Sequence, residues 1–129
     1  MENELTMISL TDIAKDQNNI FLSDTMTGNL QLIRLEHIGY FQYDTTSRQW
    51  EAVLCNHHVL KLKRHTNAQQ ILSYHPNLIQ INQSCIINIS YLVLIKWNKC
   101  ILLSPFDKGE PLQINRPFMK KLKDRFISI

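Results

Sequence analysis

The feature that most constrains the fold is a succession of short apolar runs, separated by polar turns, that begins at Asn19. Several of these runs alternate apolar and polar residues, which is typical of strands joined by hairpins. The predicted strands cover residues 20–24, 30–36, 38–44, 49–55, 58–63, 78–81, 91–97, 99–103 and 112–114. The pattern therefore predicts a mostly antiparallel β protein.

Two segments have helical spacing instead. The first can be capped by Thr66 or Asn67 and should end before Pro76; its spaced positions are Ala68, Ile71, Leu72 and His75. The second is a closing helix with Pro117 in its first turn. The side chains expected to face inward there are Phe118, Met119, Leu122 and Phe126. One mid-chain helix and one C-terminal helix thus complete the predicted fold.

The length of 129 residues fits one domain of ordinary size. Residues 1–18 are polar and weakly patterned, so we expect an N-terminal arm or linker there and the domain over residues 19–129. The acidic start does not fit a signal peptide. The longest apolar run, residues 85–95, is interrupted and falls short of the ~20 residues of a bilayer span. We expect a cytoplasmic protein without a membrane partner.

The net charge of +3 hides an asymmetry. Residues 1–60 hold three cations against eight acids, a charge of −5, whereas residues 61–129 hold eleven cations against three acids, a charge of +8. Such asymmetry suggests a side that faces a polyanion, either nucleic acid or a membrane surface. A solvated basic helix at the C-terminus is the simpler alternative.

Enzymatic and metal-binding functions find little support. Cys55, Cys85 and Cys100 form an odd set without CxxC spacing, which favours buried, inert thiols. Cys55 lies near His57 and His58, and Cys85 could meet His75, but neither context is that of a thiol hydrolase. A zinc site in this region would require alternate residues of adjoining strands to face the same way. Its candidate ligands would be Cys55, His57, His58 and His65. We predict no catalytic residue, metal, cofactor or small-molecule substrate.

Three separated blocks of the sequence resemble the LytTR family of bacterial DNA-binding domains. The central block is Leu78–Asn88, with the polar stretch Asn82-Gln83-Ser84 before two isoleucines and an asparagine, followed by the apolar stretch Ile89–Ile95. Upstream, Leu32–Tyr43 contains Ile38 before a Tyr-Phe pair. Downstream, Leu112–Arg116 precedes Phe118 and Lys120-Lys121-Leu122. The resemblance covers about residues 19–126.

This resemblance implies an elongated stack of small antiparallel sheets whose loops enter successive major grooves. It also implies a transcriptional regulator, the output domain of a response regulator in a two-component system, with two copies on tandem half-sites as an option. The family's DNA-contacting positions fall on Arg48, Asn82, Gln83 and Arg116. Thr45, Ser84 and Lys120 are candidates for phosphate contacts.

These residue types suit DNA recognition. Arginine can bind guanine, and glutamine or asparagine can bind adenine, through two hydrogen bonds each. Two features depart from the common family pattern: the neutral stretch Gln80–Gln83, and Pro117 directly after Arg116. An ordinary turn role remains the alternative for Arg48, Asn82 and Gln83.

Other polar and aromatic residues are expected to be structural. Asn88 lies inside an apolar run and should satisfy buried backbone groups. The aromatic residues are expected in the core or in cross-strand pairs rather than stacked on bases; they are Tyr40, Phe41, Tyr43, Trp50 and Trp97.

The main alternative function is a protein-interaction or dimerisation module of the same fold with little DNA affinity. The acidic first half would repel a duplex and favours this alternative weakly. A receiver domain would need about 120 further residues, which this sequence does not contain. The operator sequence, the regulated genes and the activating signal are not encoded in any recognisable motif.

Overall fold

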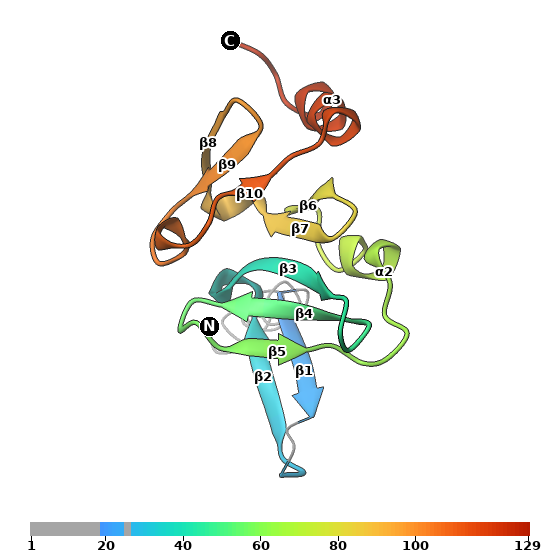
Figure 1. Ribbon diagram of the computed structural model, residues 1–129. Coiled ribbons are helices and arrows are strands. Elements are labelled where there is room, and N and C mark those ends of the chain that lie inside the picture. Colours follow the sequence, from blue (N-terminus) through green and yellow to red (C-terminus); the bar gives the residue numbers. More distant parts are fainter. Residues whose placement is uncertain (1–18, 25–26) are drawn as a thin grey trace, which may run out of the picture. The chain divides into compact units, whose positions relative to one another are not determined.

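A computed structural model describes residues 19–24 and 27–129 of the protein (Figure 1). The predicted N-terminal arm, residues 1–18, lies outside the described residues. The chain divides into two compact units, one ending at His37 and the other running from Ile38 to Ile129. The second unit contains all the candidate site residues.

The first unit contains a β-hairpin. Strands β1 (Ile20–Asp24) and β2 (Leu30–Arg34) pair antiparallel, with Phe21 opposite Ile33. Along β2, Leu30 and Leu32 are exposed whereas Ile33 is buried. The strand ends earlier than predicted because the chain turns into a short 3-10 helix, η1 (Leu35–His37).

The second unit contains a five-stranded antiparallel sheet in the order β5-β4-β3-β7-β6. Its strands are β3 (Ile38–Asp44), β4 (Gln49–Leu54), β5 (Val59–Lys61), β6 (Leu78–Asn82) and β7 (Cys85–Asn88). The apolar alternation places isoleucine side chains of β6 and β7 on the face that forms the core. Strand β3 lies at the centre, between β4 and β7.

Helix α2 (Ala68–Leu72) joins β5 to β6. The helix is capped by Asn67, one of the two predicted caps. Asn67 and Gln70 form a capping box: the Gln70 N–H donates to Asn67 Oδ1 at 2.9 Å, and the Asn67 N–H donates to Gln70 Oε1 at 2.9 Å. The helix ends at Leu72, before the predicted position His75. His75 instead accepts a hydrogen bond from the Asn77 N–H through Nδ1, at 3.0 Å.

A three-stranded sheet follows, in the order β10-β9-β8. Its strands are β8 (Leu92–Lys96), β9 (Lys99–Leu102) and β10 (Leu112–Gln113). Two 3-10 helices, η2 (Ile89–Tyr91) and η3 (Phe106–Lys108), precede β8 and follow β9. Helix α3 (Arg116–Arg125) closes the chain with a proline in its first turn, as predicted. The described residues are thus mainly β, with several small antiparallel sheets and two α-helices, which confirms the predicted fold class.

A buried cluster joins the two sheets and α3 of the second unit. Its buried members are Ile79, Ile81, Cys85, Ile87, Cys100 and Ile114, and Phe118, Met119 and Leu122 of α3 pack against them. The prediction for Phe126 is wrong: this ring is 49% exposed. The helix ends at Arg125 and Phe126 has an extended backbone, so its side chain leaves the helical face.

The aromatic predictions hold for Phe41 and Trp50, which are buried, and Trp50 packs edge-to-face on Tyr43 with ring centroids 5.8 Å apart. The prediction is wrong for Trp97, which is 89% exposed at the turn between β8 and β9. A residue at a hairpin tip has no neighbouring strand to cover it, although its sequence flanks are apolar.

The thiol predictions are confirmed for Cys85 and Cys100, which are buried, whereas Cys55 is only half-buried. Burial raises the pKa of Cys85 to about 12 and that of Cys100 to about 11. Cys55 departs from the prediction because β4 ends at Leu54 and the chain turns there: the His57 N–H donates to Leu54 O at 2.9 Å.

Candidate nucleic-acid interface

The first candidate loop is the β3–β4 turn, residues 45–48. Asp44 shapes it, because Oδ1 accepts a hydrogen bond from the Thr46 N–H at 3.1 Å and Oδ2 accepts one from the Ser47 hydroxyl at 2.8 Å. These are the local hydrogen bonds by which aspartate favours turns. Arg48 follows with φ 56°, and both Arg48 and Thr45 are exposed. The turn therefore holds Arg48 out from the sheet.

Lys61 of β5 fixes this turn from the side. Its Nζ lies 2.9 Å from Asp44 Oδ2, 2.8 Å from Ser47 Oγ and 3.4 Å from Glu51 Oε2. The hydrogen bond from Lys61, followed by that from Ser47, lowers the pKa of Asp44 to about 2. The same contact raises the pKa of Lys61. The acids nearest the turn are thus matched by a cation, and Arg48 has no carboxylate hydrogen-bonded to it among the described residues.

The second candidate loop is the β6–β7 turn, Gln83-Ser84. Asn82 braces it: Oδ1 accepts a hydrogen bond from the Ser84 N–H at 2.8 Å, and Nδ2 donates to Gln113 O at 2.8 Å. Asn82 is half-buried, whereas Gln83 and Ser84 are exposed. The carboxamide of Asn82 already makes two internal hydrogen bonds, so Gln83 is the amide that projects freely.

The third candidate element is the start of α3. Arg116 and Lys120 are exposed there. They lie four residues apart, on one face of the helix, and Lys123 continues that face one turn further. No side chain caps the helix at Asn115. Arg116 therefore lies at the positive end of the helix, and Lys120 and Lys123 continue the same helix face away from it.

Two further cations were missed by the sequence analysis. Lys63 and Arg64 are exposed directly after β5. The Leu62 N–H donates to Trp50 O at 2.9 Å and Gln49 Nε2 donates to Leu62 O at 3.2 Å, so this segment runs beside the start of β4. The signal was present, because an antiparallel β4–β5 hairpin must bring the end of β5 next to the β3–β4 turn.

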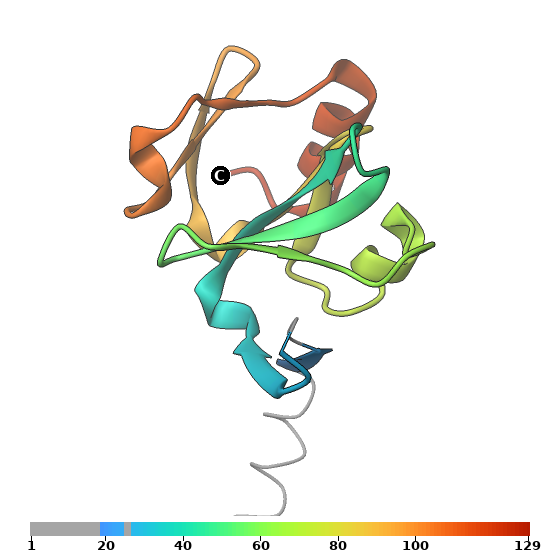
Figure 2. The ribbon, with the colours of Figure 1, turned by 60° about the horizontal axis from the view of Figure 1, so that its bottom comes forward.

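Backbone hydrogen bonds bring these elements to one side of the second unit. The Tyr43 N–H donates to Ser84 O at 2.9 Å, which places the β3–β4 turn beside the β6–β7 turn. The Asn115 N–H donates to Ile81 O at 2.8 Å, which places the start of α3 beside β6. We call this side the loop edge, and define it as residues 45–48, 63–64, 83–84 and 115–116. Figure 2 shows the β3–β4 turn (blue-green), the β6–β7 turn (yellow) and α3 (red) gathered on the same side.

The charge of the second unit is strongly positive. Residues 38–129 hold twelve Lys and Arg against five Asp and Glu, a net charge of +7.

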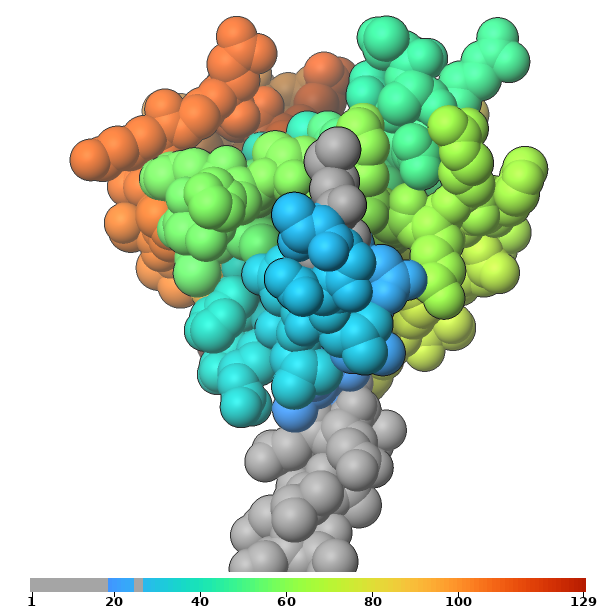
Figure 3. Space-filling view, turned by 90° about the horizontal axis from the view of Figure 1, so that it is seen from below, coloured from blue at the N-terminus to red at the C-terminus, as the bar shows by residue number. Residues whose placement is uncertain are grey.

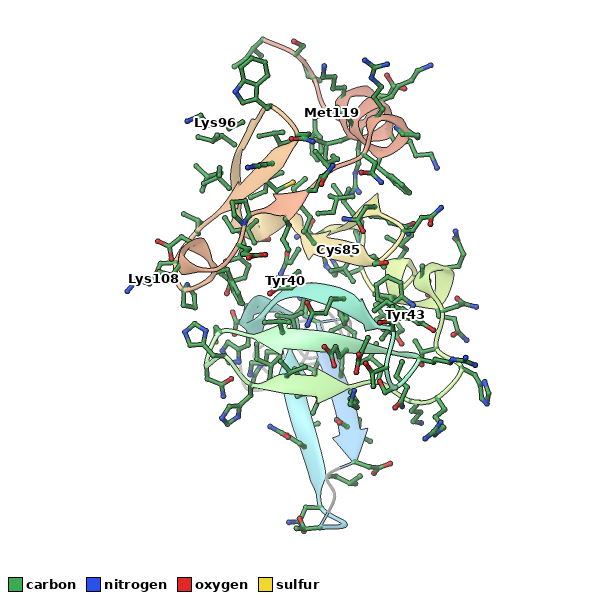
Figure 4. The ribbon with its side chains drawn as sticks, in the orientation of Figure 1. Tyr40, Tyr43, Cys85, Lys96, Lys108 and Met119 are labelled. Carbon is green, nitrogen blue, oxygen red and sulfur yellow. The ribbon has the colours of Figure 1, made fainter. Side chains whose placement is uncertain are left out.

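Seen from below, the β3–β4 turn (blue-green) projects on one side, and the segment around η3 (orange) lies on the opposite side (Figure 3). The side-chain view places Tyr43 near the loop edge and Lys108 far from it (Figure 4). Lys108 is therefore a natural control cation.

The described residues hold neither a cluster of metal ligands nor a membrane-spanning helix. No three His, Cys, Asp or Glu side chains in this part of the chain come together to hold a metal ion. In the same residues, no helix has the length and apolar character needed to cross a bilayer.

Comparison with known proteins bears on the fold. No family model matches the sequence, and no curated protein matches it. Among solved structures, the chain is similar to the LytTr DNA-binding domain of a Bacillus cereus protein described as a methyl-accepting/DNA response regulator. The match has a TM-score of 0.59 and 13% sequence identity, and covers 82% of this chain and 94% of the other. The chain therefore has the fold of a LytTr DNA-binding domain.

Proposed function

We propose that this chain is a LytTR-type regulator that binds duplex DNA sequence-specifically, with the loop edge in successive major grooves. The observation that carries the proposal is the convergence of three loops, far apart in sequence, through the Tyr43–Ser84 and Asn115–Ile81 backbone hydrogen bonds. The fold likeness and the +7 charge of residues 38–129 support it independently.

Three exposed side chains carry base recognition in this proposal. Arg48 and Arg116 present guanidinium groups that suit the O6 and N7 atoms of guanine, and Gln83 presents an amide that suits adenine. Asn82 holds the β6–β7 turn through its two internal hydrogen bonds and retains one N–H for a base or a phosphate. Each is placed on a turn or a helix end supported by the sheet, which gives the precision that base contacts require.

The surrounding polar side chains bind phosphates. Thr45, Ser84 and Lys120 flank the three base-reading positions and are all exposed. Lys63 and Arg64 extend this cationic border beyond the β3–β4 turn. Phosphate contacts position the protein on the duplex without carrying sequence information, and they compensate for the neutral stretch Gln80–Gln83.

The proposed cellular role follows from the same likeness. The chain acts in the bacterial cytoplasm as the output module of a response regulator, and two copies occupy tandem half-sites. A chain of this fold that acted only as a protein-interaction module would show no salt-dependent binding to DNA, so one set of titrations separates the two functions.

The test begins with selection of bound sequences from a random duplex pool, followed by anisotropy titrations of the selected duplex at several salt concentrations. We expect the affinity to fall steeply as salt rises, because each phosphate contact releases counterions. Arg116→Ala should weaken specific binding by about 1–3 kcal/mol, roughly 5- to 150-fold, and relax the preference at one base pair.

Lys108→Ala is the matched control, because it removes an exposed cation on the side away from the loop edge. It should leave the affinity nearly unchanged. If the selection enriches no sequence, or if Arg116→Ala and Lys108→Ala weaken binding equally, base recognition through the loop edge is refuted.

A further inference from the structure

The tip of the β8–β9 hairpin carries an exposed indole. Trp97 is 89% exposed and has φ 62°, a left-handed conformation that hairpin turns usually reserve for glycine or asparagine. A non-glycine residue in this region costs roughly 1–3 kcal/mol, and such strain clusters at sites with a function. An aromatic ring held out in this way is suited to insert into a partner.

Two lysines border the indole. Lys96 and Lys99 pair directly across the hairpin and are both exposed. Like charges opposite each other on neighbouring strands destabilise the hairpin in an isolated chain. The indole and the two cations together form what we call the hairpin knob, residues 96–99. An indole between two cations is complementary to a receptor with an apolar floor and an acidic rim.

The same unit contains such a receptor. A cavity of about 310 Å³ lies between the β3–β4 part of the large sheet and the segment from β9 through η3 to β10. Its floor and walls are mostly apolar, and include Tyr40, Val53, Leu102, Phe106 and Pro111. The Phe106 ring stands edge-to-face to Tyr40, with centroids 6.0 Å apart. An aromatic wall of this kind favours a further ring in edge-to-face geometry.

The rim of the cavity is acidic. Asp107 and Glu110 line it and are exposed, together with the cation Lys108 and the ring of His57. The rim thus carries one net negative charge, whereas the hairpin knob carries two positive charges. Figure 4 shows Lys96, at the hairpin, and Lys108, which lines the cavity, at separate places on the unit. Since Trp97 is exposed, the knob does not fill the cavity of its own chain.

We propose that the hairpin knob of one copy of this chain docks into the cavity of a second copy. Trp97 enters the cavity and packs against the aromatic wall formed by Tyr40 and Phe106, and Lys96 and Lys99 approach Asp107 and Glu110. The cavity falls in the size range of sites that enclose a small group, and aromatic anchors in pockets dominate protein interfaces. The contact does not involve the loop edge and does not require DNA.

The association is weak in solution. One buried aromatic side chain covers about 150–250 Å², well below the roughly 1,200–2,000 Å² of a stable interface. We therefore expect dissociation constants between high micromolar and millimolar. Copies held close together by another binding event would meet at a much higher effective concentration, where such a contact becomes significant.

The test is sedimentation equilibrium of the full chain, without DNA, from micromolar to near-millimolar concentration. We expect the weight-average mass to rise with concentration, and the emission of Trp97 to shift to shorter wavelength as the indole is buried. Trp50 is buried in every state and supplies a constant background. Trp97→Ala should lower the association constant about tenfold or more, and Trp97→Phe should retain part of it.

Charge reversal identifies the receptor. K96E/K99E and D107K/E110K should each abolish association, whereas an equimolar mixture of the two variants should restore it, because the reversed knob meets the reversed rim. K120E/K121E changes two exposed lysines of α3 and controls for a general effect of charge; it should associate like the original chain. All these positions are exposed, and circular dichroism verifies that each variant is folded.

Three results would overturn the proposal: a monomer at every concentration, a Trp97→Ala variant that associates normally, or a charge-reversed mixture that stays monomeric. Because the measurement contains no DNA, its outcome is independent of the proposed DNA binding. A chain that associates but does not bind DNA would refute only the proposed function, and a chain that binds DNA but does not associate would refute only the docking of the hairpin knob.

Discussion

Asn88 provides the most direct test of how the second unit is held together. Its side chain is only 1% exposed, and its amide is bonded at both ends. Nδ2 donates to Ile38 O at 3.0 Å, and Oδ1 accepts from the Ser90 N–H at 3.1 Å. One side chain thus links the end of β7 to the start of β3 and to η2. Because β7 and β3 also support two turns of the loop edge, this link positions the candidate site.

Asn88→Leu keeps the branching and the number of heavy atoms of the side chain, although its methyl groups are bulkier, and it removes both hydrogen bonds. It leaves a buried carbonyl and a backbone N–H without their partner, at about 1–3 kcal/mol each. Because part of this loss is recovered by relaxation, we expect a decrease of about 2–4 kcal/mol in the free energy of unfolding. This is a large fraction of the roughly 5–15 kcal/mol that stabilises a typical domain.

The assay is urea unfolding followed by the fluorescence of Trp50. With a slope of about 1–2 kcal/mol per molar urea, the midpoint should fall by about 1 to 4 M. Gln69→Leu, which removes an exposed carboxamide from α2, is the control and should stay within about 0.5 kcal/mol. A midpoint for Asn88→Leu equal to that of the original chain would refute the role assigned to these two hydrogen bonds.

Two further predictions concern the same unit. Gly39→Ala should destabilise the fold by about 1–3 kcal/mol in thermal or urea unfolding, because its Cβ would overlap the Phe106 ring; in a Phe106→Ala background the same change should cost little, and an equal cost there would contradict the clash. The pKa of Asp44 falls from 3.8 to about 2 on folding, so its carboxylate stabilises the fold above about pH 4 and loses this effect as the pH falls toward 2. Asp44→Asn should therefore lower the urea midpoint at pH 6 and differ little from the original chain at pH 2; a difference that persists at pH 2 would show that the contact with Lys61 is not its cause.

Local sequence patterns predicted many of the elements well. The strands at residues 20–24 and 38–44 have the predicted bounds, because each is an apolar run between clear turn residues. Asn67 caps α2 as expected from its side chain. Strand β7 was not predicted, because the continuous apolar run 85–95 shows no alternation that would mark it. Two other errors arise where an element ends. Phe126 keeps the helical period but lies beyond the last turn, and Trp97 keeps the apolar pattern but lies at a hairpin tip.

The candidate site was predicted only in part. Arg48, Gln83 and Arg116 are exposed on the loop edge, and their contacts with DNA stay predictions. The internal bonding of Asn82 could not be foreseen, because its partner, the Gln113 carbonyl, lies 31 residues away. Lys63 and Arg64 were not proposed as site residues, because their segment was assigned to a strand or its end and was not placed beside the β3–β4 turn.

The sequence by itself determined the class of fold, the polar turns and the excess of positive charge in the second half. These follow from side-chain alternation, turn chemistry and simple composition, which act over a few residues or over the whole chain. Only the tertiary structure decided which turns share an edge, that Trp97 is exposed, and that an apolar cavity with an acidic rim lies elsewhere on the same unit. Strand order and register join residues tens of positions apart, and no local pattern of side chains encodes that distance.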